Sequence, residues 1–203
     1  MGPTSREDKR QVKEERVRAV FIETAKEMIL AEGVQAVSVR RIADQAAYSY
    51  ATLYNHFENL NELLWHTRNA LMEDIGAYIH THYPADPHGV EGVRDLFKTY
   101  IEYFLLYPNA FKFFFFHDLE EPEADFVSKV RDLDFNRSFQ EVVAKCMAGG
   151  GYAPKEIEVI GKTILFAVHG LLMVYISGKD EMSRDELYAN LDAMIAHLFA
   201  KGQ

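Results

Sequence analysis

The sequence has 203 residues, enough for one large domain or for a small domain joined to a larger one. Its formal net charge of −9 argues, taken over the whole protein, against binding to nucleic acid. Residues 65–203 hold most of the acidic excess, however, so a local basic face near the N-terminus can still meet phosphate. With 48% hydrophobic and 13% aromatic residues, the composition excludes a disordered chain and allows a sizeable core.

The single cysteine and the length of the apolar stretches indicate the cellular compartment in which the protein is expected. The single cysteine, Cys146, cannot form an intramolecular disulfide, and the charged N-terminus does not resemble a signal peptide. The longest apolar stretch, Thr163 to Ile176, contains His169 and falls short of the roughly 20 residues that a bilayer span requires. We therefore expect a cytoplasmic protein that does not associate with a membrane.

The first third of the chain has the pattern of one long helix followed by two short ones. We expect the long helix to begin near Asp8 and to be capped by Gly33, where the apolar periodicity stops. Ser38 and Ser49 each stand directly before a short apolar stretch, so each is predicted to cap a short helix. The tight turn between the short helices is Ala46-Ala47-Tyr48. This arrangement is typical of a helix-turn-helix.

The remaining two thirds also have helical periodicity, and no stretch alternates with period two. Asn59 and Glu62 form a capping box that starts a fourth, long helix. Breaks at Pro and Gly separate the later predicted helices, which cover about 89–107, 111–116, 122–148, 154–177 and 184–200. The sequence therefore predicts an all-α fold of about nine helices. We expect a helix-turn-helix DNA-binding domain at residues 1–58 and a helical ligand-binding and dimerisation domain at residues 59–203.

The second short helix of a helix-turn-helix enters the major groove, and its N-terminal residues meet base edges. Here Thr52 can reach a phosphate or a thymine methyl, and the helix N-termini at the two serine caps can face phosphates. The predicted DNA-binding residues are Ser38, Arg40, Arg41, Ser49, Tyr50, Thr52, Tyr54, Asn55 and His56. A preceding basic arm of Arg6, Lys9, Arg10, Lys13, Arg16 and Arg18 supports this prediction; alone, it would be a solvated helix face.

Three stretches carry a family resemblance: Ser38–Ala43, Ser49–Phe57 and Glu62–Leu64. Together they resemble the DNA-binding domain of the TetR family of ligand-responsive transcriptional regulators. The resemblance implies an all-helical homodimer whose last two helices pair across a twofold axis. It also implies a cavity among the central helices that binds a small molecule and changes the affinity for DNA.

The sequence departs from the family pattern at three positions. Ala47 stands where the family has a turn glycine, and a positive φ there would strain it. Tyr50 stands where the family often has a lysine or another small or basic residue, and Leu60 where it has a lysine. These changes affect the operator sequence and the affinity, and not the fold.

Aromatic and polar side chains of the central helices are candidates to line the ligand cavity. They are Trp65, His66, Asn69, Met72, Phe97, Tyr100, Phe104, Phe114, His117, Phe139, Phe166, His169 and Met173. The alternative for most of them is ordinary core packing. For His169 the alternative is a core histidine bonded to a backbone carbonyl or a carboxylate. No metal site is predicted, because His80 and His82 are two residues apart and do not share a helix face. No cofactor is predicted either.

The last two predicted helices carry more apolar surface than the core of one subunit would take up. This favours a four-helix interface between two subunits, the alternative being burial within one monomer. The predicted interface residues are Ile164, Val168, Leu171, Leu172, Tyr175, Leu187, Leu191, Met194, Ile195 and Leu198.

These patterns predict a DNA-binding transcriptional regulator, a repressor that a small hydrophobic or aromatic effector releases from a palindromic operator. Two alternatives remain: a helical interaction module, and a small helical enzyme that uses the central cavity without binding DNA. The sequence has no nucleophile elbow and no paired-carboxylate motif, so we do not expect an enzyme.

Overall fold

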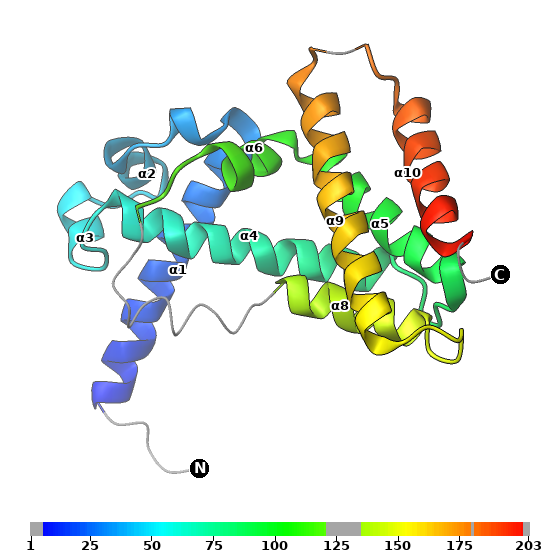
Figure 1. Ribbon diagram of the computed structural model, residues 1–203. Coiled ribbons are helices and arrows are strands. Elements are labelled where there is room, and N and C mark those ends of the chain that lie inside the picture. The colour runs from blue at the N-terminus through cyan, green and yellow to red at the C-terminus, as the bar shows by residue number, and fades with distance from the viewer. Residues whose placement is uncertain (1–5, 121–134, 180, 201–203) are drawn as a thin grey trace. The chain divides into compact units, whose positions relative to one another are not determined.

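The computed structural model describes residues 6–120, 135–179 and 181–200. Within these ranges the chain forms nine α-helices and one 3-10 helix, without a strand, which confirms the predicted all-α class (Figure 1). In chain order they are α1 (Arg6–Glu32), η1 (Val34–Ala36), α2 (Val39–Gln45), α3 (Tyr50–Tyr54), α4 (Leu60–His82), α5 (Gly89–Leu106), α6 (Pro108–Phe116), α8 (Phe135–Cys146), α9 (Pro154–Ser177) and α10 (Arg184–Phe199). The predicted start of a helix at Pro122, with Phe126, Val130 and Leu133, lies outside the described residues.

The chain folds into two compact units. The N-terminal unit comprises Met1–Asp74 and Tyr107–Leu133, and the C-terminal unit comprises Ile75–Leu106 and Asp134–Gln203. Helix α4 contributes residues to both units, because it continues past Asp74. Helix α6 belongs to the N-terminal unit, although it directly follows α5 of the C-terminal unit in sequence.

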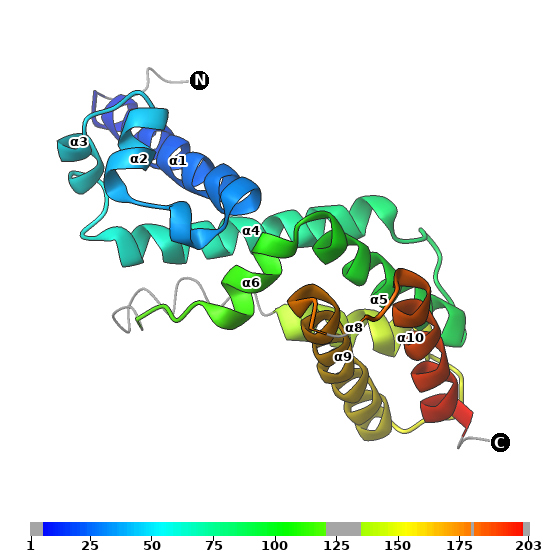
Figure 2. The same cartoon turned by 90° about the horizontal axis from the view of Figure 1, so that it is seen from above.

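The N-terminal unit is built around a small apolar core shared by α1, α2, α3 and the start of α4. Its buried members are Phe21, Ala25, Met28, Ile42, Leu53, Phe57 and Leu63. The three α1 residues recur at helical spacing and so lie on one face. In both Figure 1 and Figure 2, α2 lies beside α1, and α3 packs against α2. This packing fixes the position of the two short helices.

Local capping determines where these helices begin, as predicted. Ser38 Oγ accepts a hydrogen bond from the backbone N–H of Arg41 at 3.3 Å, and Ser49 Oγ accepts one from that of Thr52 at 3.1 Å. Asn59 Oδ1 accepts from the N–H of Glu62 at 2.9 Å, which starts α4. Such caps satisfy N–H groups that have no partner within the helix.

The C-terminal unit has an aromatic and aliphatic core formed by α5, α8, α9 and α10, which pack against one another. Phe97, Tyr100 and Phe104 of α5 are at most 2% exposed, and Phe139 of α8 contacts the rings of Phe97 and Tyr100. A Cβ at Gly161 would lie 2.8 Å from Oε1 of Gln140, so the glycine permits the close approach of α9 to α8.

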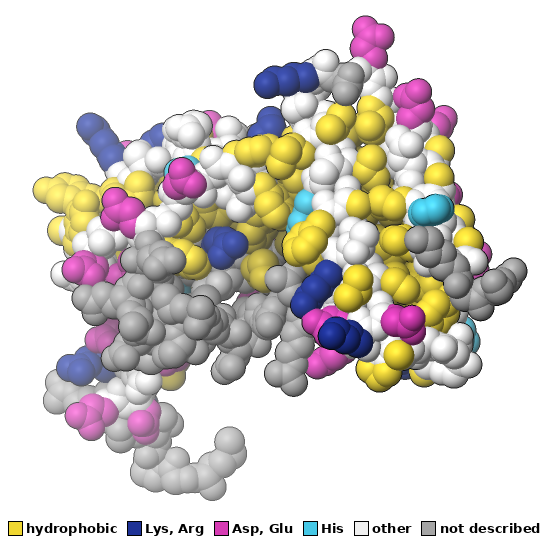
Figure 3. Space-filling model, viewed as in Figure 1, with side chains coloured by type: hydrophobic (Ala, Val, Ile, Leu, Met, Phe, Trp, Pro, Cys, Tyr) yellow, Lys and Arg dark blue, Asp and Glu magenta, His cyan; other side chains and the backbone are white. Residues whose placement is uncertain are grey.

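One face of α9 is apolar and exposed. Val159, Phe166 and Met173 are 56%, 67% and 43% exposed, and hydrophobic surface is visible over α9 and α10 in Figure 3. By length and composition α9 is able to cross a membrane, with 28% of its most apolar window buried. A single such helix is weak evidence for a membrane span, because a core helix of a protein outside membranes meets the same criterion.

Candidate nucleic-acid interface

The turn between α2 and α3 holds a non-glycine residue in the left-handed region. Ala47 has φ +57°, so the position does have the positive φ that would strain an alanine standing in place of the family's turn glycine. The turn is closed by a hydrogen bond of 2.9 Å from the N–H of Tyr48 to the carbonyl of Ala43. An L-residue in this conformation brings Cβ close to the backbone and costs roughly 1–2 kcal/mol. The helix-turn-helix therefore retains its tight turn at the expense of strain.

Helix α3 presents two large aromatic side chains to solvent. Tyr50 and Tyr54 are 66% and 52% exposed, whereas Leu53 between them is buried in the core. Thr52 Oγ1 lies 2.9 Å from Ser49 Oγ, so the predicted base-reading hydroxyl is held at the helix N-terminus. Asn55 is exposed and ends the helix as its C-cap. The outer face of α3 can thus combine aromatic contacts with a few hydrogen-bonding groups.

The two predicted arginines of α2 differ in their surroundings. The guanidinium of Arg41 bonds to Glu32 Oε1 of α1 and to the carbonyl of Ala36, at 2.8 and 2.9 Å, and the contact with Glu32 raises its pKa. Arg40 is exposed and forms no ion pair within the described residues. Arg40 is therefore available to a phosphate, while Arg41 ties α2 to the end of α1.

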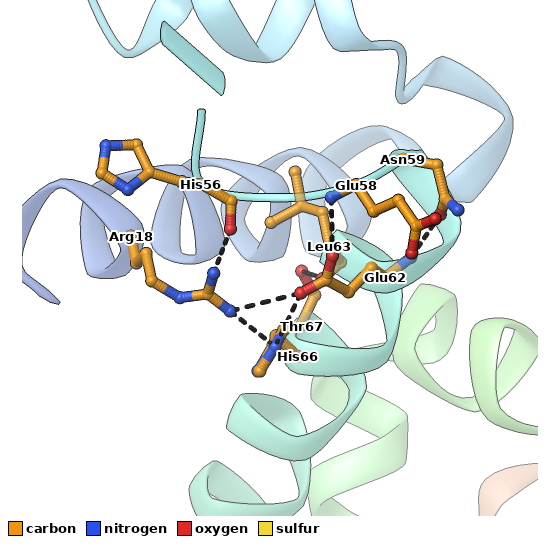
Figure 4. Close-up of polar contacts among 8 residues, drawn as sticks. All are labelled: Arg18, His56, Glu58, Asn59, Glu62, Leu63, His66 and Thr67. Carbon is orange, nitrogen blue, oxygen red and sulfur yellow. Dashed lines mark hydrogen bonds and ion pairs between the residues drawn. The ribbon is translucent and has the colours of Figure 1, made fainter. Parts of the chain in front are cut away.

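Arg18, counted above with the basic arm, connects three segments of the N-terminal unit (Figure 4). Its guanidinium donates to the carbonyl of His56, directly after α3, and to Nε2 of His66 on α4 at 2.7 Å. It also lies 3.5 Å from Glu62 Oε1 and 4.3 Å from the ring centroid of Phe57. Arg18 therefore joins α1 and the end of the helix-turn-helix to the first turns of α4.

His56 and His66 both contact Arg18, but through different groups. Burial and the neighbouring Arg18 lower the pKa of His66, so the neutral imidazole can accept the hydrogen bond from the guanidinium. The backbone carbonyl of His56 faces the cluster, while its imidazole points away from it in Figure 4. The His56 side chain thus lies on the other side of the chain from the Arg18 contacts.

The N-terminal turns of α1 are highly charged and exposed. Lys9, Lys13 and Arg16 carry the basic charge, and Arg10 forms a solvent-exposed pair with Glu14 at 3.5 Å. Exposed pairs of this kind contribute little to stability. These cations therefore remain available to an external anion, as the prediction for a basic arm requires.

The predicted ligand-binding residues fall into both units. Trp65, His66, Asn69, Met72, Phe114 and His117 lie in the N-terminal unit, and Phe97, Tyr100, Phe104, Phe139, Phe166, His169 and Met173 lie in the C-terminal unit. Among the latter, Phe166 and Met173 are exposed and the others are buried or partly buried. A surface pocket of about 460 Å³ near the start of α10 is lined by Glu181, Met182, Glu186, Ala189 and Asn190, none of them a predicted ligand residue. The predicted set stays a prediction.

His169 has a partner that the sequence did not suggest. Its Nε2 lies 2.8 Å from the hydroxyl of Tyr100, whose ring packs edge-on against Phe104 and Phe139. Burial lowers the pKa of His169 to about 4 and raises that of Tyr100 above its ordinary value. A neutral imidazole bonded to a tyrosine hydroxyl therefore lies at the edge of the aromatic core of the C-terminal unit.

The predicted dimer residues divide by burial within one chain. Six of them are fully buried in the C-terminal unit: Ile164, Val168, Leu172, Leu187, Leu191 and Ile195. The other four, Leu171, Tyr175, Met194 and Leu198, are partly buried. The outward apolar residues of α9 include Val159, which sequence reasoning missed.

Sequence reasoning also missed Arg68 and the role of Arg18. Arg68 stands three residues after Trp65, on the helix that carries several predicted ligand residues, and its guanidinium lies over the rings of Trp65 and Phe114. The spacing to Trp65 was the available signal. Among the described residues, no three His, Cys, Asp or Glu side chains gather in a way that could hold a metal ion.

Comparison with known proteins agrees with this geometry. Residues 21–65 match the family model described as bacterial regulatory proteins, tetR family, and no curated protein matches the sequence. A TetR-family regulator of Streptomyces coelicolor superposes with a TM-score of 0.70 at 15% identity, covering 91% of this chain and 83% of that one. RolR in complex with resorcinol gives 0.67 at 16%, covering 95% and 93%. BioQ with its natural double-stranded DNA operator gives 0.61 at 16%, covering 90% and 98%.

The capped helix-turn-helix, followed by a helical C-terminal part, defines a DNA-binding transcription regulator. Its DNA-binding domain belongs to the tetR family of bacterial regulatory proteins, as the resemblance of the sequence implied.

Proposed function

We propose that this regulator is a repressor that binds a palindromic operator as a homodimer and leaves it when a small hydrophobic or aromatic effector binds. The observation that carries the proposal is the helix-turn-helix itself, with α3 capped at Ser49 and its outer face exposed. BioQ, whose fold is similar, is seen with its DNA operator, and RolR with the ligand resorcinol. Residues 1–58 would bind DNA, and residues 59–203 would bind the effector and dimerise.

The proposed DNA surface combines base and phosphate contacts. Tyr50, Thr52 and Asn55 would meet base edges from α3 in the major groove. Ser38, Ser49, Tyr54, His56 and the arginines of α2 would meet phosphates, with Arg40 the more available of the two. The exposed cations of α1 would add phosphate contacts outside the groove.

The proposed dimer surface is formed by α9 and α10. The predicted residues that are only partly buried, Leu171, Tyr175, Met194 and Leu198, would be joined by the exposed stripe of Val159, Phe166 and Met173. These last three recur every seven residues, so they lie along one face of α9. Exposed alanines at 189, 193 and 196 would allow close approach of α10.

The proposed mechanism is a shift between two arrangements of the dimer. Two DNA-binding heads must lie about 34 Å apart to enter successive major grooves. An effector that binds better to a dimer with a different spacing would release the operator. Helix α4 would transmit the change, because its residues Glu62 and His66 contact Arg18, which also contacts the carbonyl after α3.

A gel shift on the DNA upstream of the protein's own gene, at about 50 and 200 mM salt, tests DNA binding. We expect a specific complex that weakens steeply with salt, and Arg40→Ala should reduce the slope of affinity against salt by about one phosphate contact. Arg184→Ala, an exposed arginine of α10, is the matched control and should leave the slope unchanged. Equal binding to unrelated DNA, or none, would contradict the proposal and favour an interaction module.

A further inference from the structure

Arg68 of α4 is a partly buried cation placed between two aromatic rings of the N-terminal unit. Its guanidinium carbon lies 5.3 Å from the ring centroid of Trp65 and 5.5 Å from that of Phe114 on α6. Burial lowers the pKa of this arginine. Within the part of the chain that the structure describes, it forms no ion pair and no hydrogen bond. The guanidinium is thus partly withdrawn from water, with no carboxylate of the described residues beside it.

The other partly buried guanidinium groups of the described residues have carboxylates. Arg18 contacts Glu62, and Arg94 contacts Asp192 at 3.0 Å. A buried charge without a counter-ion is costly, and aromatic rings compensate only part of that cost. Arg68 therefore has unused capacity for an anion. Its five N–H donors form a planar fork that matches a carboxylate in a two-point contact.

The aromatic side of this site is fixed in advance. The indole Nε1 of Trp65 donates to the carbonyl of Glu120 at 2.7 Å. Asn61 bonds to both backbone groups of Glu120: Nδ2 donates to its carbonyl at 2.9 Å, and Oδ1 accepts from its N–H at 3.1 Å. One hydrogen bond therefore orients the Trp65 ring beside Arg68, and the two bonds of Asn61 fix the Glu120 backbone that accepts it. Such preorganisation reduces the entropy lost on binding.

We propose that Arg68 binds the carboxylate of an aromatic acid, whose ring packs against Trp65 and Phe114. The assignment rests on the proposed function insofar as this acid is taken to be the effector. A cation between rings favours an aryl carboxylate over a neutral aromatic compound of the same size, because a neutral compound would leave the buried charge without a partner.

The only tryptophan of the chain is Trp65, so its fluorescence reports directly on this site. The full-length protein is titrated with benzoate, phenylacetate and cinnamate, and in parallel with the three corresponding amides. We expect saturable quenching by at least one acid, with an affinity roughly 10–100-fold above that of its amide, the factor expected for a charge-assisted hydrogen bond. No saturable quenching by any acid, or equal affinity for acid and amide, would overturn the proposal.

Variants of Arg68 test whether the guanidinium is responsible. Arg68→Met should abolish the preference for the acid, and Arg68→Lys should keep part of it, because lysine retains the charge and loses the planar fork. Arg184→Met is the matched control: this arginine lies over the ring of Tyr188 but is exposed, and its loss should leave the titration unchanged. Circular dichroism checks that each variant is folded. If Arg68→Met does not fold, Arg68→Lys and the comparison of acids with amides still test whether the guanidinium binds the carboxylate.

The operator gel shift, repeated with the same six compounds, separates this site from the proposed function. An acid that quenches Trp65 through Arg68 without releasing DNA supports the site and contradicts the role of the acid as effector. Release of DNA by the neutral amides, with no quenching by the acids, supports an effector-released repressor and overturns the site at Arg68.

Discussion

Arg18 of α1 and His66 of α4, 48 residues apart in sequence, are joined by a hydrogen bond of 2.7 Å. The same guanidinium bonds to the carbonyl of His56, so three segments of the N-terminal unit depend on one side chain. Arg18→Met should lower the free energy of unfolding by roughly 1–3 kcal/mol, because it leaves partly buried acceptors without a donor. Urea denaturation of the purified protein measures the change.

The control for Arg18 is Arg10, on the same helix. Its ion pair with Glu14 is exposed to solvent, so Arg10→Met should change the free energy of unfolding by less than about 0.5 kcal/mol. Similar losses for the two variants would show that Arg18 acts as a surface charge and not as a connection between α1 and α4.

The strained turn between α2 and α3 predicts a substitution that raises the free energy of unfolding, whereas Arg18→Met lowers it. Ala47 has φ +57°, which glycine adopts without the Cβ penalty, so Ala47→Gly should stabilise the protein by roughly 0.5–1 kcal/mol. Ala46, at φ −75°, is the neighbouring control, and Ala46→Gly should destabilise because it only increases the freedom of the unfolded chain. Thermal unfolding followed by circular dichroism compares the two, and a lower melting temperature for Ala47→Gly would contradict the argument.

The histidine of the C-terminal core predicts a pH dependence. The pKa of His169 is about 4 in the folded protein, against about 6.5 in an unfolded chain. The unfolded state therefore binds the proton first as the pH falls. The free energy of unfolding keeps its full value above pH 6.5 and decreases by up to about 3 kcal/mol as the pH falls towards 4. The lowered pKa of His66 acts in the same direction.

Denaturation at a series of pH values checks this prediction. His169→Gln should reduce the slope of stability between pH 6.5 and 4, leaving the part that belongs to His66. His197, an exposed residue of α10, provides the control, and His197→Gln should retain the wild-type slope. An unchanged slope in His169→Gln would mean that the imidazole is not protonated on unfolding in this range.

The starts of the helices could be predicted because capping is a local interaction. Ser38, Ser49 and Asn59 each bond to an N–H group three residues away, so the pattern is complete within the sequence. A positive φ at Ala47 was raised only through the family's turn glycine at this position, because nothing local to an alanine indicates it. Arg18 could not be assigned, since its partners at 56 and 66 are brought to it only by the packing of the apolar core.

The direction of α9 also lay beyond the sequence. This helix is apolar around most of its circumference, so periodicity could not distinguish the inward face from the outward one. In the structure Ile164 and Val168 are buried, while Phe166 between them is 67% exposed. Helix α6 gives a second example: Asn109 donates to the carbonyl of Leu30 at the end of α1, a contact across 79 residues that no local pattern contains.

The exposed stripe of α9 leads to the last prediction. If α9 pairs with its copy in a second subunit, Phe166→Asp introduces a charge into an apolar interface and should convert the dimer to a monomer at micromolar concentration. Phe116 of α6 is 55% exposed in the N-terminal unit and outside the proposed interface, so Phe116→Asp is a control of equal chemistry. Light scattering gives the mass of each variant. A Phe166→Asp protein that remains dimeric, or a wild-type protein that is already monomeric, would rule out this face of α9 as the dimer contact. A monomeric wild-type protein would also lack the two DNA-binding domains that a palindromic operator requires.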